Sequence, residues 1–187
     1  GLFSRVAAQK IAARNGRRDP NQDFGTNPCS EIILRSNQFC NLSEIVVRED
    51  DTEETLKAKA EVAAIIGTLQ ATLTDFRYLR NIWKKNTEEE ALLGVSLTGI
   101  MDHPVMSGRS GDAEVIHWLH NIKEVAIETN KEWAARLGIN PSAAITCVKP
   151  SGTVSQLVNS ASGIHPRFSP YYKRTVRADV KDPLAQY

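Results

Sequence analysis

The spacing of apolar positions along the chain predicts three main helices. Over residues 4–15 the apolar positions recur at helical spacing and stop at Asn15-Gly16. Acidic residues at 50–54 favour a helix N-terminus. A long helix should follow with one continuous apolar stripe, made of Leu56, Ala60, Ala63, Ile66, Leu73, Phe76 and Trp83. A third helix is predicted over Asp112–Leu137 with Gly138 as its C-cap, and a shorter one from Val154.

Shorter apolar runs predict strands between these helices. They cover residues 31–34, 41–47, 93–97 and 143–148, with a basic strand-like piece at 172–177. Residues 21–27 instead have the composition of a loop, with Gly25 and the pair Asn27-Pro28. Strands that alternate with long helices predict an α/β fold with mostly parallel strands. About five strands are too few for a closed barrel, so a barrel as the parent fold would be only partly present.

Composition narrows the class of protein. The chain has 187 residues, 41% of them apolar and 24% charged, which is typical of one globular domain. A formal net charge of +1 gives no overall field toward nucleic acid or an anionic membrane, and no apolar run is long enough for a transmembrane helix. Three cysteines suit a reducing compartment, so a cytoplasmic location is predicted. The start at Gly1 and the abrupt end predict a piece of a longer chain.

The segment Asn27-Pro28-Cys29-Ser30-Glu31 carries the strongest candidate chemistry. An amide, a thiol and a carboxylate at i, i+2 and i+4 of an extended loop share one face. Such a trio could hold a substrate hydroxyl, react through sulfur and accept a proton. The structural alternative is a capping Asn27, a buried Cys29 and a surface Glu31, and spacing by itself leaves both open.

The other cysteines and the histidines exclude some sites. Cys40 could form a disulfide with Cys29 or act separately from it, and no C-x-x-C redox pair is present. Cys147 lies in an apolar run and is predicted to be a small core residue. The four histidines do not combine with the cysteines at zinc-ligand spacing, so no metal site is predicted.

A second candidate site is Lys149-Pro150-Ser151-Gly152-Thr153, between a predicted strand and a predicted helix. Ser151 and Thr153 offer hydroxyl groups, Gly152 permits close approach to the backbone, and the helix start offers free amides. This combination suits a phosphate group, although the glycine spacing is not that of a Walker A loop. An ordinary capped helix start is the alternative.

In this order the motifs Asn27-Pro28-Cys29-Ser30-Glu31, Cys40-Asn41-Leu42 and Pro150-Ser151-Gly152-Thr153 resemble the catalytic half of a ribonucleotide reductase large chain. The closer resemblance is to the class II, adenosylcobalamin-dependent branch, on the Asn-Pro-Cys form, the short gap to Cys40, the Lys-Pro-Ser-Gly-Thr loop and residues 163–172. The segments 1–5 and 13–18 resemble the part of the family that precedes its finger loop.

The resemblance implies a fold and a reaction. Residues 1–187 would be one partial catalytic domain, the C-terminal part of a ten-stranded α/β barrel with a finger loop that carries a radical cysteine. The activity implied is reduction of ribonucleotides, with triphosphates favoured, to 2′-deoxyribonucleotides for DNA synthesis. The cofactor would be adenosylcobalamin, and the reductant thioredoxin or a similar dithiol.

The resemblance also assigns roles to residues. Cys29 would be the thiyl-radical cysteine, Glu31 the acceptor of the 3′-hydroxyl proton, and Asn27 the residue that orients the ribose hydroxyls. Cys40 would be one of two reducing cysteines, its partner lying outside this chain. Ser151, Gly152 and Thr153 would bind the substrate phosphates.

Two other interpretations stay open at this level. One is a class I large subunit, driven by a separate metal subunit. The other is a nucleotide-binding module that keeps the Ser151-Gly152-Thr153 site while Cys29 is only structural. If the chain is a fragment, the rest of the parent chain is a required partner, and the isolated chain is expected to be inactive.

Overall fold

The computed structural model describes residues 2–14, 16–173 and 175–187 and, within them, every side chain except that of residue 153. At its centre are two parallel strands, β3 (Asn41–Val46) and β4 (Leu93–Thr98), paired in register from Asn41↔Leu93 to Val46↔Thr98. Residues 143–147 run along the other edge of β4, where the Leu93 N–H donates to the carbonyl of Ala144 (3.0 Å) and the Cys147 N–H to that of Val95 (3.0 Å). The predicted strands at 41–47 and 93–97 are confirmed. The one predicted at 143–148 forms only a parallel bridge, between Val95 and Thr146.

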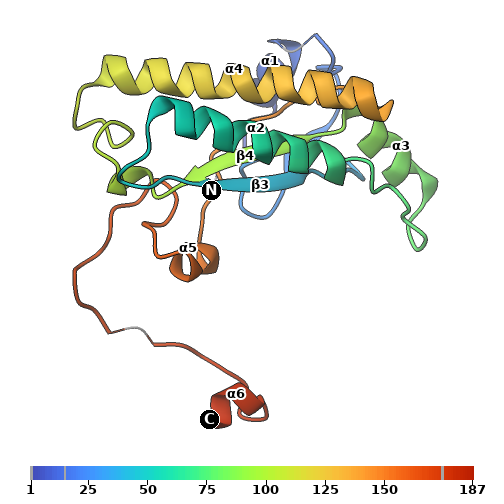
Figure 1. Ribbon diagram of the computed structural model, residues 1–187. Coiled ribbons are helices and arrows are strands. Elements are labelled where there is room, and N and C mark those ends of the chain that lie inside the picture. The colour runs from blue at the N-terminus through green and yellow to red at the C-terminus, as the bar shows by residue number, and fades with distance from the viewer. Residues whose placement is uncertain (1, 15, 174) are drawn as a thin grey trace.

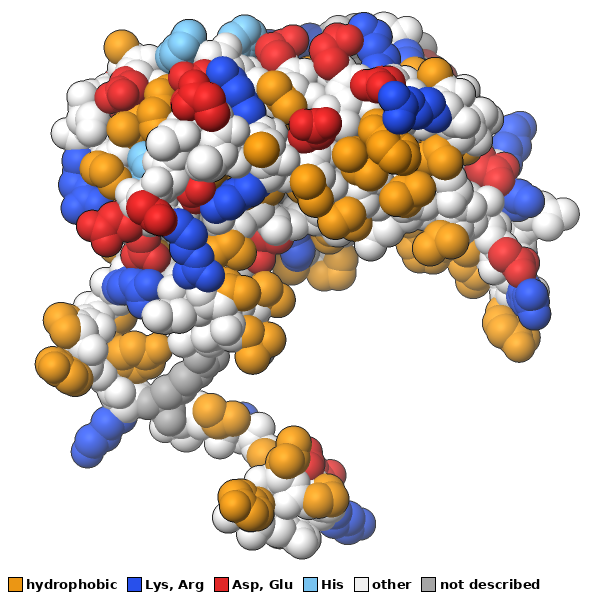
Figure 2. Space-filling view, in the orientation of Figure 1, with side chains coloured by type: hydrophobic (Ala, Val, Ile, Leu, Met, Phe, Trp, Pro, Cys, Tyr) orange, Lys and Arg blue, Asp and Glu red, His pale blue; other side chains and the backbone are white. Residues whose placement is uncertain are grey.

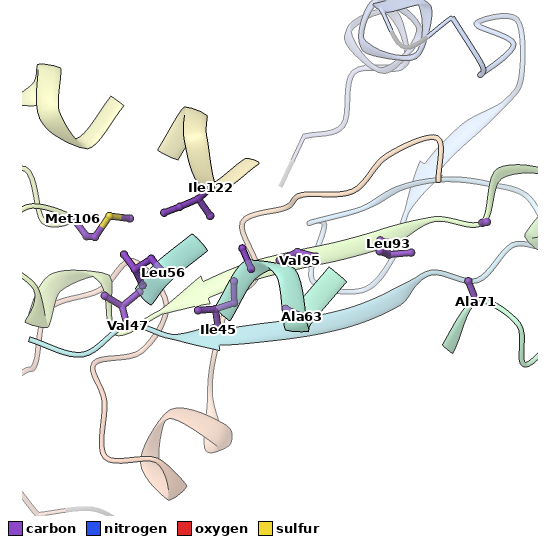
Figure 3. Close-up of a cluster of buried hydrophobic side chains, with 11 residues drawn as sticks. Ile45, Val47, Leu56, Ala63, Ala71, Leu93, Val95, Met106 and Ile122 are labelled. Carbon is purple, nitrogen blue, oxygen red and sulfur yellow. The ribbon is translucent and has the colours of Figure 1, made fainter. Parts of the chain in front are cut away.

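Helices cover one face of this sheet. α2 (Glu53–Gln70) lies against β3 and β4, and α4 (Asp112–Leu137) packs across α2 (Figure 1). α4 matches its predicted bounds, and Gly138 ends it in the left-handed conformation at φ 69°. The main core lies between sheet and helices (Figure 3), and its buried members are Ile45, Val47, Leu56, Ala60, Ala63, Ala71, Ala91, Leu93, Val95, Met106 and Ile122.

The prediction of one long helix after residue 50 is wrong. α2 ends at Gln70, and a second helix, α3 (Asn81–Glu90), begins only after a ten-residue turn segment, 71–80. The Thr72 hydroxyl donates to the Leu69 carbonyl (2.7 Å), a competing bond of the kind that ends helices. The apolar stripe is therefore broken. Leu73 is exposed, and so are Val62, Ile66 and Leu69 of α2. Figure 2 shows hydrophobic side chains gathered on this face of the molecule.

Two further predictions need correction. The predicted loop at 21–27 contains β1 (Phe24–Thr26), which pairs antiparallel with β2 (Ile33–Arg35) to form a hairpin, because Phe24 is buried against Ala8 and Ala12 of α1 (Arg5–Arg14). The basic piece at 172–177 forms no strand in its described residues, since no sheet edge lies beside it. It leads as exposed chain to α6 (Pro183–Gln186) (Figure 1).

The remaining short elements lie around the carboxyl end of β4. η1 (Ile100–Asp102) follows β4 directly, and α5 (Thr153–Leu157) lies on the sheet face opposite α2 and α4 (Figure 1). The helix predicted from Val154 is thus confirmed. The α/β class is confirmed too, although the described strands form two two-stranded sheets rather than a closed barrel. In the described part of the chain, no helix has the length and apolarity needed to cross a membrane.

A buried carboxylate fixes the hairpin to the sheet. Glu90, at the end of α3, is 1% exposed and accepts hydrogen bonds from Arg18 (2.9 and 3.1 Å) and from the Gln38 amide (2.6 Å). The Arg18 guanidinium also donates to the Ile33 carbonyl in β2 (3.0 Å). Because a buried charge needs such partners, these bonds place the hairpin beside the start of β4.

Replacing Glu90 tests this constraint. Glu90→Gln should lower the free energy of unfolding by about 3–5 kcal/mol, because it leaves the Arg18 guanidinium buried without its counter-charge. The matched control is Glu89→Gln: the Glu89 side chain pairs with Arg35 but is 56% exposed, and its loss should cost about 1 kcal/mol or less. Urea unfolding of both variants measures the difference. Equal losses would contradict the role given to Glu90.

Candidate active site

The candidate site lies on the face of the sheet that α2 and α4 leave open. There Leu42 of β3 and Ile32 of the hairpin pack with Cys40 and Cys147. Gly94 makes this close packing possible, because a Cβ atom on it would lie 2.4 Å from the Cδ2 atom of Leu42 and 3.1 Å from the Cys147 sulfur. The hairpin thus rests directly on the sheet and carries the loop that joins β1 to β2.

That loop is a tight turn and not the extended segment predicted. The Ser30 N–H donates to the Asn27 carbonyl (3.0 Å), and Ser30 has a positive φ of 64°. The Asn27 side-chain oxygen accepts from the Ile32 N–H (3.1 Å) and closes the loop from within. As a result the turn exposes Cys29, whereas the Glu31 side chain is turned inward and is only 1% exposed.

The Glu31 carboxylate is paired with a lysine. The Lys149 ammonium donates to Glu31 Oε1 at 3.2 Å, and Glu31 Oε2 is buried with no hydrogen-bond partner. Burial acts to raise the pKa of Glu31, but hydrogen bonds from its own backbone N–H, from Asn27 and from Lys149 outweigh it and lower the pKa. Glu31 is therefore held as a carboxylate with one oxygen unused.

Two thiols lie beside this pair. Cys40, directly before β3, is half-buried, and burial together with the charge of Glu31 raises the pKa of its thiol. The same causes raise the pKa of Cys147 to about 12. Cys147 was predicted to be a small core residue, and it does pack in the cluster of Ile32 and Leu92, but it also borders the candidate site. All three cysteines are free, so the Cys29–Cys40 disulfide that the sequence left open is not formed.

The predicted phosphate loop is only partly available. The Ser151 hydroxyl is buried and donates to Glu44 Oε2 (3.2 Å), so it is already engaged by a carboxylate of β3. Gly152 is exposed, and no atom lies within 4 Å of a Cβ atom built on it. Thr153 begins α5, and its side chain lies outside the described part of the structure. The hydrogen bond to Glu44 thus holds Ser151 beside β3, whereas the Gly152 backbone is exposed to solvent.

An ion pair anchors the chain beyond α5. Arg167 donates to both oxygens of Asp102, each at 3.0 Å, and the Ala161 N–H donates to Asp102 Oδ2 (2.8 Å). Burial acts to raise the pKa of Asp102, but these hydrogen bonds outweigh it and lower the pKa. Residues 159–167 are therefore tied to η1 at the carboxyl end of β4.

Comparison with known proteins gives relatives in the family that the motifs resemble. No protein-family model matches the sequence. The adenosylcobalamin-dependent ribonucleoside-triphosphate reductase of Lactobacillus helveticus is 30% identical over 184 residues, 86% of this chain and 24% of the reductase. The reductase of the same name from Lacticaseibacillus paracasei is 29% identical over an alignment of 206 positions, gaps included. This alignment covers 97% of this chain and 26% of that reductase.

A solved structure agrees with these relatives. The crystal structure of a B-12 dependent (class II) ribonucleotide reductase superposes with a TM-score of 0.64 at 25% identity, over 75% of this chain and 22% of that one. This chain is homologous to a segment of the class II ribonucleotide reductases. It spans about a quarter of the length of the curated relatives it matches. The resemblance in its motifs is thus confirmed, and class II is favoured over class I and over a module without redox chemistry.

Sequence reasoning missed two charged residues of this site. Lys149 was noted only as the start of the phosphate loop, and Glu44 only as part of a strand. Lys149 directly follows the apolar run 143–148, and Glu44 lies within the predicted strand 41–47; a charged residue at such a place is most often paired when it is buried. Burial raises the pKa of Glu44, whose Oε1 is buried without a hydrogen-bond partner.

The thiols should differ in reactivity. At mildly alkaline pH, iodoacetamide should modify Cys29 first, because it is exposed, and Cys147 last, because it is half-buried with a pKa of about 12 and so forms little thiolate. Peptide mass spectrometry over a time course gives the order. Urea-unfolded chain, in which all three thiols should react alike, is the control. Modification of Cys147 before Cys29 in the folded chain would contradict the site geometry.

The Asp102–Arg167 pair should make stability depend on pH. A lowered pKa in the folded state adds stability above the ordinary value of 3.8, and that stability is lost as the pH falls through the folded-state pKa. Asp102→Asn should therefore cost about 1–3 kcal/mol in urea unfolding at neutral pH and much less in strong acid. Asp75→Asn, which removes an exposed ion pair with Arg77, should show little change at either pH. A cost for Asp102→Asn that is the same at both pH values would refute this account.

Proposed function

We propose that this chain is the catalytic segment of an enzyme that reduces ribonucleoside triphosphates to 2′-deoxyribonucleotides by thiyl-radical chemistry. One observation carries the proposal: a single tight loop exposes the Cys29 thiol and holds the Glu31 carboxylate, buried and ionised, above Cys40. The homology with class II ribonucleotide reductases supports it, since those relatives are named for this reaction. Because the chain spans about a quarter of their length, the proposal concerns the longest natural chain that contains these residues.

The cofactor proposed is adenosylcobalamin. An exposed thiol at the tip of a turn fits a group that must reach the sulfur from outside the loop, and Cys29 is such a thiol. When bound, this cofactor supplies the radical that oxidises the Cys29 thiol. The protein's own contribution is to hold the sulfur in place and the carboxylate beside it.

In the proposed reaction, Cys29, Asn27 and Glu31 each have a separate role at the ribose. The Cys29 thiyl takes the hydrogen atom from C3′, which leaves a carbon radical and restores the S–H bond. Asn27 orients the hydroxyl groups and Glu31 takes the 3′-hydroxyl proton, so that the 2′-hydroxyl leaves as water with a proton from one of two reducing thiols. The hydrogen of the other thiol passes to C2′, and Glu31 returns its proton to the 3′ oxygen. At the end Cys29 returns a hydrogen atom to C3′.

The electrons for this reduction come from thiols. Cys40 and a second cysteine supplied from outside this chain give two electrons and end as a disulfide. Thioredoxin or a similar dithiol would reduce that disulfide and restore the pair. The half-buried position of Cys40 beside Glu31 places it on the sheet face where the loop lies.

Substrate binding is assigned to the loop before α5. The open backbone of Gly152 would meet the phosphates, with Ser151 and Thr153 beside it. Glu44 accepts from the Ser151 hydroxyl and thereby holds Ser151 beside this loop. The parallel strands would belong to a ten-stranded barrel with a finger loop, completed by chain outside these residues.

Anaerobic turnover tests the proposal. The longest natural chain is given cytidine triphosphate and a dithiol, with and without adenosylcobalamin, and deoxycytidine product is counted. Product is expected only with the cofactor. Cys29→Ser should abolish it, and Glu31→Gln should lower it by roughly 10²–10⁴-fold, the usual contribution of a positioned general base.

Ser36→Ala, an exposed side chain beyond β2, is the control and should keep full turnover. Circular dichroism must show that the variants fold. Turnover that survives in Cys29→Ser would exclude the radical mechanism. Product that requires a separate metal subunit would assign the chain to class I instead.

A further inference from the structure

Lys149 is a cation that interacts electrostatically with several titratable groups of this site. Its charge acts on Glu31, Cys40, Glu44 and Cys147. These groups come from the hairpin loop, from β3 and from the segment beside β4. The Lys149 side chain is 28% exposed and therefore lies mostly out of water. Electrostatic interactions are stronger there than in water.

The contact with Glu31 is specific to one oxygen. Lys149 Nζ donates to Oε1 at 3.2 Å, whereas Oε2 is buried and has no hydrogen-bond partner. A buried carboxylate oxygen without a donor is rare in folded proteins, because it forfeits the hydrogen bonds that it had in water. A donor that reaches this oxygen would therefore form the hydrogen bond that it lacks.

We infer that Lys149 is a positioning residue: by binding Oε1 it keeps Glu31 ionised and leaves Oε2 to accept the proton of the substrate hydroxyl. This rests on the proposed function, in which Glu31 is the general base. In the step the hydroxyl O–H bond breaks, the proton bonds to Oε2, and the electron pair stays on the substrate oxygen. The carboxylic acid so formed still accepts from Lys149 through Oε1.

The structure separates this role from phosphate binding. Lys149 stands directly before the Pro150-Ser151-Gly152 loop, where a basic side chain suits a phosphate. Its ammonium instead donates to the Glu31 carboxylate, so it is already engaged by a side chain of the hairpin loop. If Lys149 positions the general base, replacing it should change the pH dependence of turnover. If it binds phosphate, replacing it should change the KM for the triphosphate.

The first test is the titration of Glu31 in the folded chain. With ¹³C-labelled glutamate, the carboxyl resonance of Glu31 is identified by its loss in Glu31→Gln and followed against pH. Lys149→Met should raise the pKa of Glu31, because only the hydrogen bonds from its own backbone N–H and from Asn27 then oppose burial, and Lys149→Arg should keep it low. Lys123→Met, an exposed lysine on α4, is the matched control and should leave the titration unchanged.

The second test is turnover of the longest natural chain with the same variants. Lys149→Met should lower kcat about tenfold or more and move the acid limb of the pH profile to higher pH, with the KM for the triphosphate unchanged. Lys149→Arg should recover most of the rate. If Lys149→Met does not fold, Lys149→Gln replaces it, since it retains a donor without the charge.

The two tests fail in different ways. A Glu31 titration that is the same in wild type and in folded Lys149→Met overturns the inference, and so does a variant that changes only KM. The titration needs neither substrate nor cofactor. Absence of cobalamin-dependent turnover in the wild type would therefore refute the proposed function, and with it the base role of Glu31, whatever the titration shows.

Discussion

The structure depends on one buried charge, the carboxylate of Glu90. It stands where α3 gives way to β4, and it brings together Arg18 from the N-terminal part and Gln38 from the segment after the hairpin. Each of these partners also bonds the hairpin, through the Ile33 carbonyl and the Arg35 N–H. A carboxylate at 1% exposure is tolerated only with such partners, so folding of the sheet and docking of the hairpin are coupled.

That coupling explains why a reactive loop can be both tight and exposed. The hairpin has only three residues in each strand, too few to be stable by itself in water. Its stability comes from the ionic contacts at its base and from Ile32, which packs on the sheet. The turn at its tip is thereby free to expose Cys29 while Glu31 is directed inward.

The electrostatics of the site follow from the same arrangement. Carboxylates and thiols come from three separate segments, and the sheet face that α2 and α4 do not cover leaves room for them. The buried carboxylate of Glu31 needs a counter-charge, and Lys149 supplies it at the point where the hairpin and the segment beside β4 meet. The pKa values of Glu31 and Glu44 shift in opposite directions, because burial prevails at Glu44, whereas hydrogen bonds from its own backbone N–H, from Asn27 and from Lys149 outweigh burial at Glu31.

Much of the fold was predictable from local pattern. The α4 helix follows from apolar spacing and a terminal glycine, and β3 and β4 follow from short apolar runs, since each pattern fits one backbone period. The break between α2 and α3 was not predictable, because periodicity continues across residues 71–80 while hydroxyl side chains compete for the backbone there. β1 was missed because its three residues form a strand only through pairing with Ile33–Arg35, on the other side of the loop.

For the site, the sequence by itself determined which chemical groups are present: the motifs name Asn27, Cys29, Glu31 and Cys40 and resemble those of the ribonucleotide reductases. Only the tertiary structure decided how those groups are used. It exposed Cys29, buried Glu31, engaged Ser151 with Glu44, and brought Lys149 to Glu31 across 118 positions of chain. Contacts between distant segments depend on packing and on the pairing of buried charge, and neither leaves a periodic trace in the sequence.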